Sequence, residues 1–91
     1  MTYLRCTIGP GVFRHERQIK IDVEGQIYRA IVDAGDVVES TENGQVLSVG
    51  LVRVTVVSES NDTVLVDLPR ETFSAGIRIF VPPELLQQHA Q

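Results

Sequence analysis

The chain has 91 residues, of which 43% are hydrophobic and 22% are charged, values that exclude an intrinsically disordered protein. Its single cysteine, Cys6, excludes an internal disulfide. No stretch approaches the roughly 20 apolar residues of a membrane-spanning helix, and the first residues carry no apolar run of signal-peptide length. We therefore expect one small cytoplasmic domain over residues 1–91, with no membrane partner.

The net charge of −4 is distributed unevenly along the chain. Residues 1–31 carry five cations and three anions, whereas residues 32–91 carry three cations and nine anions. An acidic domain is a poor partner for nucleic acid unless its cations cluster. Oppositely charged patches would steer self-association, although folding could equally mix the two segments in space.

The apolar residues are mostly valine and isoleucine, whose branching at Cβ favours extended backbone. Turn-forming groups of glycine, proline and asparagine recur between short apolar runs. This spacing predicts an all-β fold of six or seven mostly antiparallel strands in a small barrel or sandwich. By size and strand count, an SH3-like barrel is the best specific match.

The clearest predicted element is a β-hairpin over residues 18–32 with its turn at Glu24-Gly25. Its second arm, residues 26–32, is apolar on both faces, so its register stays open. Its first arm alternates strictly, which points three side chains into the core: Ile19, Ile21 and Val23.

Residues 45–58 form the longest apolar stretch, in which Leu47 and Val49 share one parity. Gly50 lies where the parity changes, which favours a β-bulge that keeps both halves facing one core. The alternative is a strand buried on both faces. The later residues of the stretch share the other parity: Val52, Val54 and Val56.

Two further strands are predicted at residues 63–68 and 77–81. Their alternation leaves Leu65 and Phe80 on the face away from the core. The side chains predicted to face inward are Val64, Val66, Leu68, Ile77, Ile79 and Val81.

Pro82-Pro83 ends the last of these strands, because proline cannot donate to the β-ladder. Proline suits the first turn of a helix, so residues 83–88 are expected to form one or two helical turns. So short a helix is marginal alone and would need Leu85 or Leu86 to dock against the rest of the domain.

The leading functional hypothesis is a binding or assembly module, without catalysis, that acts through protein–protein contact. Apolar side chains left outside a thin core favour self-association, so a homo-oligomer or another protein is the expected partner. The candidate interface residues are Leu65, Phe80, Leu85 and Leu86.

The alternative hypothesis is a binder of small ligands or single-stranded nucleic acid through residues 14–29. Arg14, His15 and Arg17 suggest an anion-binding patch, in a polar run that is either loop or strand. Aromatic side chains beside cations stack on bases, and the candidates for such a surface are Lys20, Tyr28 and Arg29.

A remote enzymatic alternative rests on Asp33-Ala34-Gly35, which follows an apolar pair. This segment resembles the start of the retroviral-type aspartic protease motif. The resemblance implies a homodimeric peptidase in which Asp33 of each subunit shares a proton. It covers about five residues and departs at Ala34, where the family has a hydroxyl residue. The other interpretation is a turn in which the aspartates at positions 33 and 36 serve the local geometry.

Neither a metal nor a cofactor is expected. His15 and His89 lie far apart and have no recognised ligand spacing with Cys6. The acids between Asp33 and Glu42 recur every three residues, which does not match a calcium loop. No glycine-rich phosphate loop is present, and Cys6 is expected to be a buried apolar residue.

Overall fold

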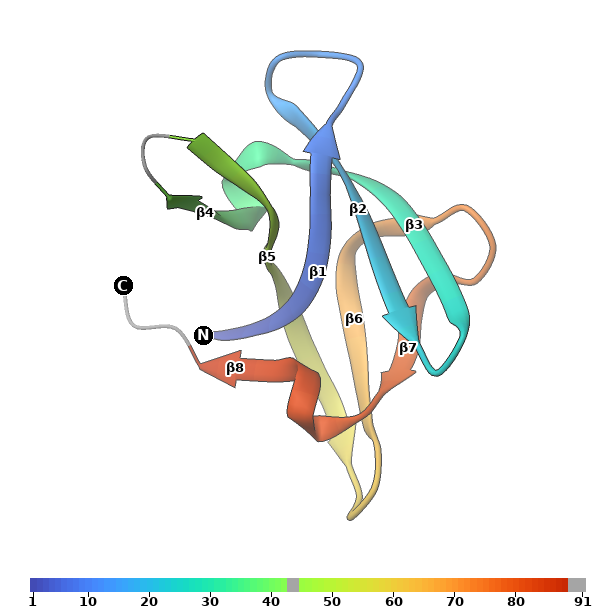
Figure 1. Ribbon diagram of the computed structural model, residues 1–91. Helices are drawn as coiled ribbons and strands as arrows, with labels where there is room; N and C mark the ends of the chain where they lie inside the picture. The colour runs from blue at the N-terminus through green and yellow to red at the C-terminus, as the bar shows by residue number, and fades with distance from the viewer. Residues whose placement is uncertain (43–44, 89–91) are drawn as a thin grey trace.

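The computed structural model describes residues 1–42 and 45–88, and it shows a closed five-stranded antiparallel barrel with three further strands attached (Figure 1). Strands account for most of the described residues, so the predicted all-β class is confirmed, and the SH3-like assignment is consistent with this barrel. The strands are β1 (Thr2–Pro10), β2 (Glu16–Val23), β3 (Gln26–Asp33), β4 (Val37–Glu42), β5 (Gln45–Glu59), β6 (Val64–Thr72), β7 (Gly76–Val81) and β8 (Leu86–Gln88).

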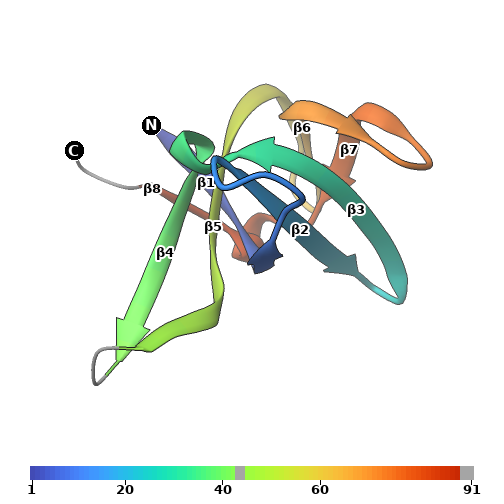
Figure 2. The same ribbon diagram turned by 90° about the horizontal axis from the view of Figure 1, so that it is seen from above.

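The barrel follows the order β5-β1-β2-β3-β6 and closes where β5 pairs with β6. The remaining strands extend the sheet, since β4 pairs with β5, β7 with β6 and β8 with β1. Figure 2 shows β1, β2 and β3 side by side, with the β4–β5 hairpin projecting away from them. β5 is long enough to join the projecting hairpin to the barrel, because it pairs in turn with β4, β1 and β6.

The predicted hairpin forms β2 and β3, and its turn fixes the register that the sequence left open. Glu24 and Gly25 both adopt positive φ, at 51° and 88°, as a two-residue turn that matches strand twist requires. Val23 therefore lies opposite Gln26, and the pairing continues without interruption along both strands. On β3 this places Ala30 in the core.

The core lies inside the barrel and is built mainly from branched aliphatic side chains. The inward positions predicted on β2 and β6 are confirmed, with Val23 only partly buried. The largest fully buried side chains come from strands all round the barrel: Leu4, Ile19, Ile21, Val32, Val52, Val66 and Val81.

The predicted change of phase at Gly50 is wrong. The ladder between β5 and β1 runs without interruption past this residue. Val49 is 51% exposed on the outside, whereas Gly50, Val52 and Val54 are buried. Only one face of β5 therefore joins the core here, so the two-sided alternative does not hold either. The side chain of Leu47 lies outside the described residues.

Close packing is the reason for glycine at position 50. A Cβ atom there would lie 2.5 Å from the carbonyl oxygen of Val38 and 2.6 Å from Cδ1 of Ile8. The irregular pairing belongs to the ladder between β4 and β5, where the register shifts between Glu39 and Thr41. Gly50 thus lets β4 and the side chain of Ile8 approach β5 from two sides.

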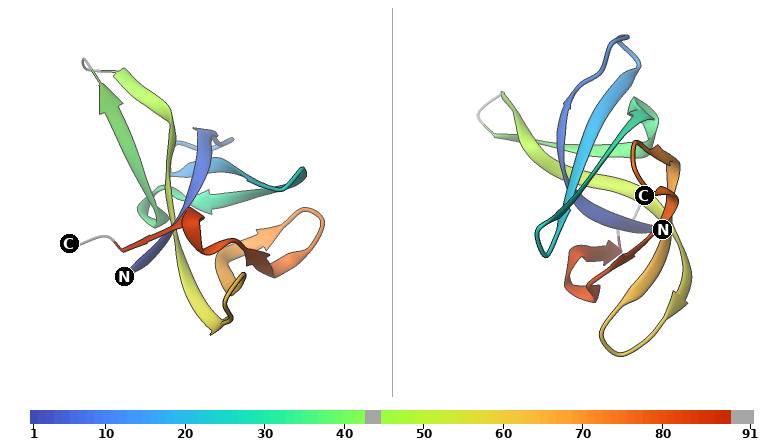
Figure 3. Two further views of the ribbon diagram at one scale, coloured as in Figure 1. Left: turned by 60° about the horizontal axis from the view of Figure 1, so that its bottom comes forward. Right: turned by 90° about the vertical axis from the view of Figure 1, so that its right-hand side faces the viewer.

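Two predictions near the C-terminal end also need correction. Ile77 is 40% exposed, because it lies beyond the Asp67–Arg78 pair, where the register of β6 and β7 shifts. The expected helical turns reduce to one 3-10 turn, Pro83–Leu85. The chain then extends as β8, which lies beside the first residues of β1 (Figure 3).

β8 is short, but it covers one end of the barrel. Leu86 pairs with Leu4 of β1, and Gln88 pairs with Thr2. The side-chain amide of Gln88 also donates to the hydroxyl of Thr2 at 2.9 Å. Leu85 and Leu86 both pack against the core, so this segment is docked through the two leucines although it does not form the expected helix.

Candidate functional site

Apolar side chains gather on the outer face of β6 and β7. Leu65 and Phe80 are direct cross-strand partners. Leu65 is half-buried, whereas Phe80 is 61% exposed. Val57, 41% exposed, lies in the bulge of β5 next to the Ser58–Leu65 pair. We call Val57, Leu65 and Phe80 the outer apolar row.

A charged pair lies next to this row. Arg78 and Asp67 are the neighbouring cross-strand pair, and the guanidinium donates to both carboxylate oxygens, at 2.8 and 3.1 Å. Hydrogen bonding from Arg78 lowers the pKa of Asp67 below its usual value. Both groups are therefore charged at neutral pH, and the two-point contact fixes the plane of the guanidinium.

The outer apolar row ends on β7, which is an edge strand of the sheet. Within the described residues, β7 pairs with β6 on one side and with no strand on the other. Such an edge presents N–H and C=O groups to any further strand. The two remaining interface candidates, Leu85 and Leu86, lie elsewhere, against the core beside β1.

The six candidate ligand-binding residues do not form one surface. Lys20 and Arg29 are direct cross-strand partners on the outer face of β2 and β3. Tyr28, adjacent to Arg29 on β3, packs against the core instead, where its strand partner is Ile21. Tyr28 therefore lies on the opposite face of the sheet from the two cations, and it provides no stacking platform beside them.

Arg14 and His15 lie in the exposed loop of residues 11–15, and strand β2 begins only at Glu16. The polar run is therefore loop in its first part and strand in its second. Phe13, 62% exposed, stacks against His15 with ring centroids 6.0 Å apart. The loop thus displays an aromatic pair beside an arginine.

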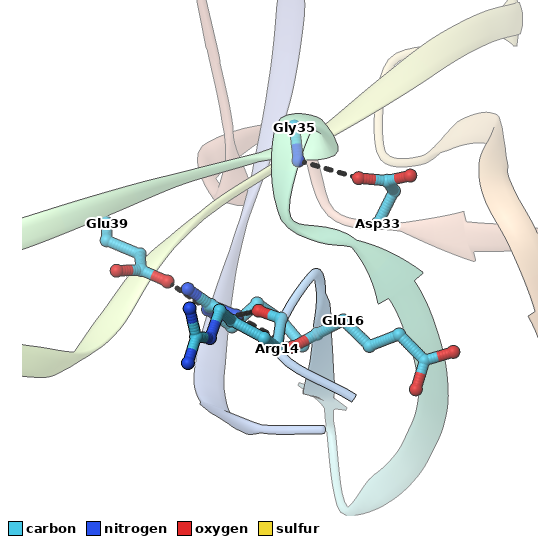
Figure 4. Close-up of polar contacts among 6 residues, drawn as sticks. Arg14, Glu16, Asp33, Gly35 and Glu39 are labelled. Carbon is cyan, nitrogen blue, oxygen red and sulfur yellow. Dashed lines mark hydrogen bonds and ion pairs between the residues drawn. The ribbon is translucent and has the colours of Figure 1, made fainter. Parts of the chain in front are cut away.

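Arg17 is one of the residues that hold this loop to the barrel. Its Nη1 donates to the carbonyl oxygens of Arg14 and Glu16, at 2.9 and 2.8 Å. Its Nε donates to the carboxylate of Glu39, which extends from β4 toward the loop (Figure 4). The charge of Arg17 is therefore already neutralised, so we assign this side chain a structural role.

Lys20 and Arg29 are in a different electrostatic situation. Neither forms an ion pair within the part of the chain that the structure describes, although they face each other directly. Like charges opposite one another on neighbouring strands are destabilising. Thr7 of β1 is the next residue in the same row, opposite Lys20.

Replacing Arg29 with glutamate is expected to raise the melting temperature. The change converts the repulsive pair with Lys20 into an attractive one. Thermal unfolding at low ionic strength is the suitable measurement, because salt screens exposed charges. Arg29→Gln, which removes repulsion without adding attraction, should fall between wild type and Arg29→Glu. A melting temperature unchanged in both variants would mean that the two charges do not interact.

Asp33 serves the local turn. Its Oδ1 accepts from the N–H of Gly35 at 3.1 Å and caps the 3-10 turn Ala34–Asp36 (Figure 4). Asp36 in turn accepts from Arg53 at 2.6 Å. Asp33 thus has the local role that the turn interpretation assigns to it, whereas Asp36 joins the turn to β5 through Arg53.

Cys6 is buried, and burial raises the pKa of its thiol to about 12. The thiol is therefore protonated at neutral pH, whereas nucleophilic and metal-binding cysteines act as thiolates.

The sequence analysis identified the cations Lys20 and Arg29 and the apolar pair of Leu65 and Phe80. It missed the contact of Arg17 with Glu39, which no local sequence pattern signals.

Within residues 1–42 and 45–88, no three or more His, Cys, Asp and Glu side chains are grouped as metal ligands would be. The same residues include no helix with the length and apolar character needed to cross a bilayer. Comparison with protein-family models, with curated proteins and with solved structures found no match to this chain.

Proposed function

We propose that this chain is a non-catalytic assembly module, which binds a second copy of itself through the open edge of β7. The observation that carries the proposal is the exposed Leu65–Phe80 pair beside a strand edge that has no partner within the described chain. Edge strands with adjacent apolar surface are favoured sites for strand addition.

The sequence of β7 is complementary to itself in an antiparallel arrangement. If Ile79 lies opposite its own copy on a two-fold axis, Phe80 lies opposite Arg78 of the second copy, and the reverse. An arginine over an aromatic ring is attracted by the ring quadrupole. The ion pair with Asp67 already orients Arg78, so little further ordering of this side chain is needed.

The turn role of Asp33 and the buried thiol of Cys6 support the non-catalytic part of the proposal. A single cysteine in 91 residues also fits a reducing compartment, so we place the module in the cytoplasm as part of the same proposal.

Phe80→Ser is expected to convert a dimer into a monomer at low micromolar concentration. Losing the burial of one phenylalanine side chain costs about 1.5–3 kcal/mol per copy, which raises the dissociation constant at least tenfold. Light scattering after gel filtration measures the mass. The wild type should keep twice the mass of one chain at low and high salt, because the contact is mainly apolar.

The matched control is Phe13→Ser, since Phe13 is 62% exposed and Phe80 is 61% exposed. It lies in the loop between β1 and β2, outside β6 and β7, and should leave the mass unchanged. A wild type with the mass of one chain at every concentration would refute the assembly. Loss of the dimer in both variants would refute β7 as its site.

A further inference from the structure

We propose a second site, on the outer face of β1, β2 and β3, that binds one phosphate group of a small phosphorylated ligand. Thr7, Lys20 and Arg29 form a row across the three strands, each opposite the next. The row therefore presents one hydroxyl and two cations, spaced by neighbouring strands roughly 4.8 Å apart. Hydroxyls and cationic donors are the groups that bind phosphate oxygens in proteins.

Lys20 and Arg29 form no ion pair within the described chain, unlike several of its other cations. Three arginines of the described chain form ion pairs with carboxylates: Arg17 with Glu39, Arg53 with Asp36 and Arg78 with Asp67. Lys20 and Arg29 instead face each other without an ion pair in the described chain. An anion between them would remove the repulsion, so binding would also stabilise the fold.

The surface beside this row is hollowed. Thr7, Gly9, Gln18, Lys20 and Arg29 contribute to the lining of an open hollow of about 380 Å³. Apart from Gly9 and its two chain neighbours, no residue has an atom within 4 Å of the position that a Cβ on Gly9 would occupy, so there is free space beside the cations. The amide of Gln18 adds a further polar group in the adjoining row, where Gln18 pairs with Gly9.

The surroundings favour a small ligand over a nucleic acid. Asp22 lies two residues beyond Lys20 on the same face of β2, where it would repel a second phosphate. Tyr28 packs against the core and offers no surface for stacking bases beside the cations. With a net charge of −4, the protein would also repel a polyanion at longer range.

The test is titration of the 15N-labelled full chain with inorganic phosphate and with glycerol 3-phosphate, followed by amide chemical shifts. Saturable shifts confined to residues of the hollow are expected, with millimolar dissociation constants. Lys20→Gln and Arg29→Gln should each weaken binding at least fivefold. Arg53→Gln, which removes one positive charge from β5, should not change it.

The two ligands distinguish the sources of the phosphate. Equal affinities would assign the site to free phosphate, and tighter binding of glycerol 3-phosphate would assign it to an ester whose organic part lies in the hollow. Binding of neither ligand, or equal weakening by Arg53→Gln, would overturn the proposal. The site is independent of assembly through β7, so the same titration can be made on Phe80→Ser.

Discussion

Replacing Leu4 with alanine is expected to lower the free energy of unfolding by about 2–5 kcal/mol. Leu4 has no exposed surface. On β1 it lies opposite Val52 of β5 and Leu86 of β8, so strands on both sides would have to move to fill the cavity. Domains of this kind are stable by roughly 5–15 kcal/mol, and the loss is therefore a large part of the total.

Urea denaturation followed by circular dichroism measures this effect. Val49→Ala is the matched control, since Val49 lies on β5 but is 51% exposed. Its truncation should change stability by no more than about 0.5 kcal/mol. If Leu4→Ala were as mild as this control, the strands around Leu4 would have moved to close the cavity, which would contradict rigid packing around this side chain.

Gly50→Ala is expected to destabilise the protein by about 1–3 kcal/mol, although it adds only one methyl group. The new Cβ would lie 2.5 Å from the carbonyl oxygen of Val38 and 2.6 Å from Cδ1 of Ile8. The side chain of Ile8 can rotate away, but the carbonyl belongs to the backbone of β4. Relief therefore requires β4 to move away from β5.

Gly9→Ala is the control for this substitution. Gly9 lies on β1, and apart from its two chain neighbours nothing lies within 4 Å of its ideal Cβ position. The Gly9→Ala protein should therefore be about as stable as the wild type. The midpoints of urea unfolding compare the two variants, and amide shifts of β4 in Gly50→Ala should report the displacement. Equal stability of both variants would contradict the close approach of β4 to residue 50.

The parts of the fold that the sequence predicted best are those where one face of a strand is buried and the other is solvated. Ile19 and Ile21 on β2, and Val64 and Val66 on β6, alternate with outward side chains in this way. β8 was missed because three residues are too few to show alternation. Its pairing with β1 depends on residues at the other end of the chain.

The position of Gly50 was recognised as unusual, but its cause was misassigned. The glycine accommodates Val38 and Ile8, which approach from other strands, and a local pattern carries no information about such neighbours. A bulge is the explanation that a local pattern favours, because it needs only residues adjacent in sequence.

The candidate sites were predicted in part. Alternation alone placed Leu65 and Phe80 together outside the core, and the structure pairs them. The same alternation separates Tyr28 from Arg29, so grouping these two on one surface neglected a signal that was present. The apposition of Lys20 and Arg29 depends on the register set by the turn at Glu24.

The pairing of β1 with both β5 and β8 has a consequence for the folding rate. The bond between Gln88 and Thr2 joins residues 86 positions apart, and β5 reaches β1 only after β2, β3 and β4 have been passed. Closing such long loops costs chain entropy before any contact compensates for it. Barrels dominated by distant pairings fold in milliseconds to seconds, far more slowly than helical proteins of equal stability. During synthesis, β1 therefore cannot pair with β5 and β8 until these later strands have been made. The apolar side chains around Leu4 remain exposed to solvent until the strands that cover them have left the ribosome.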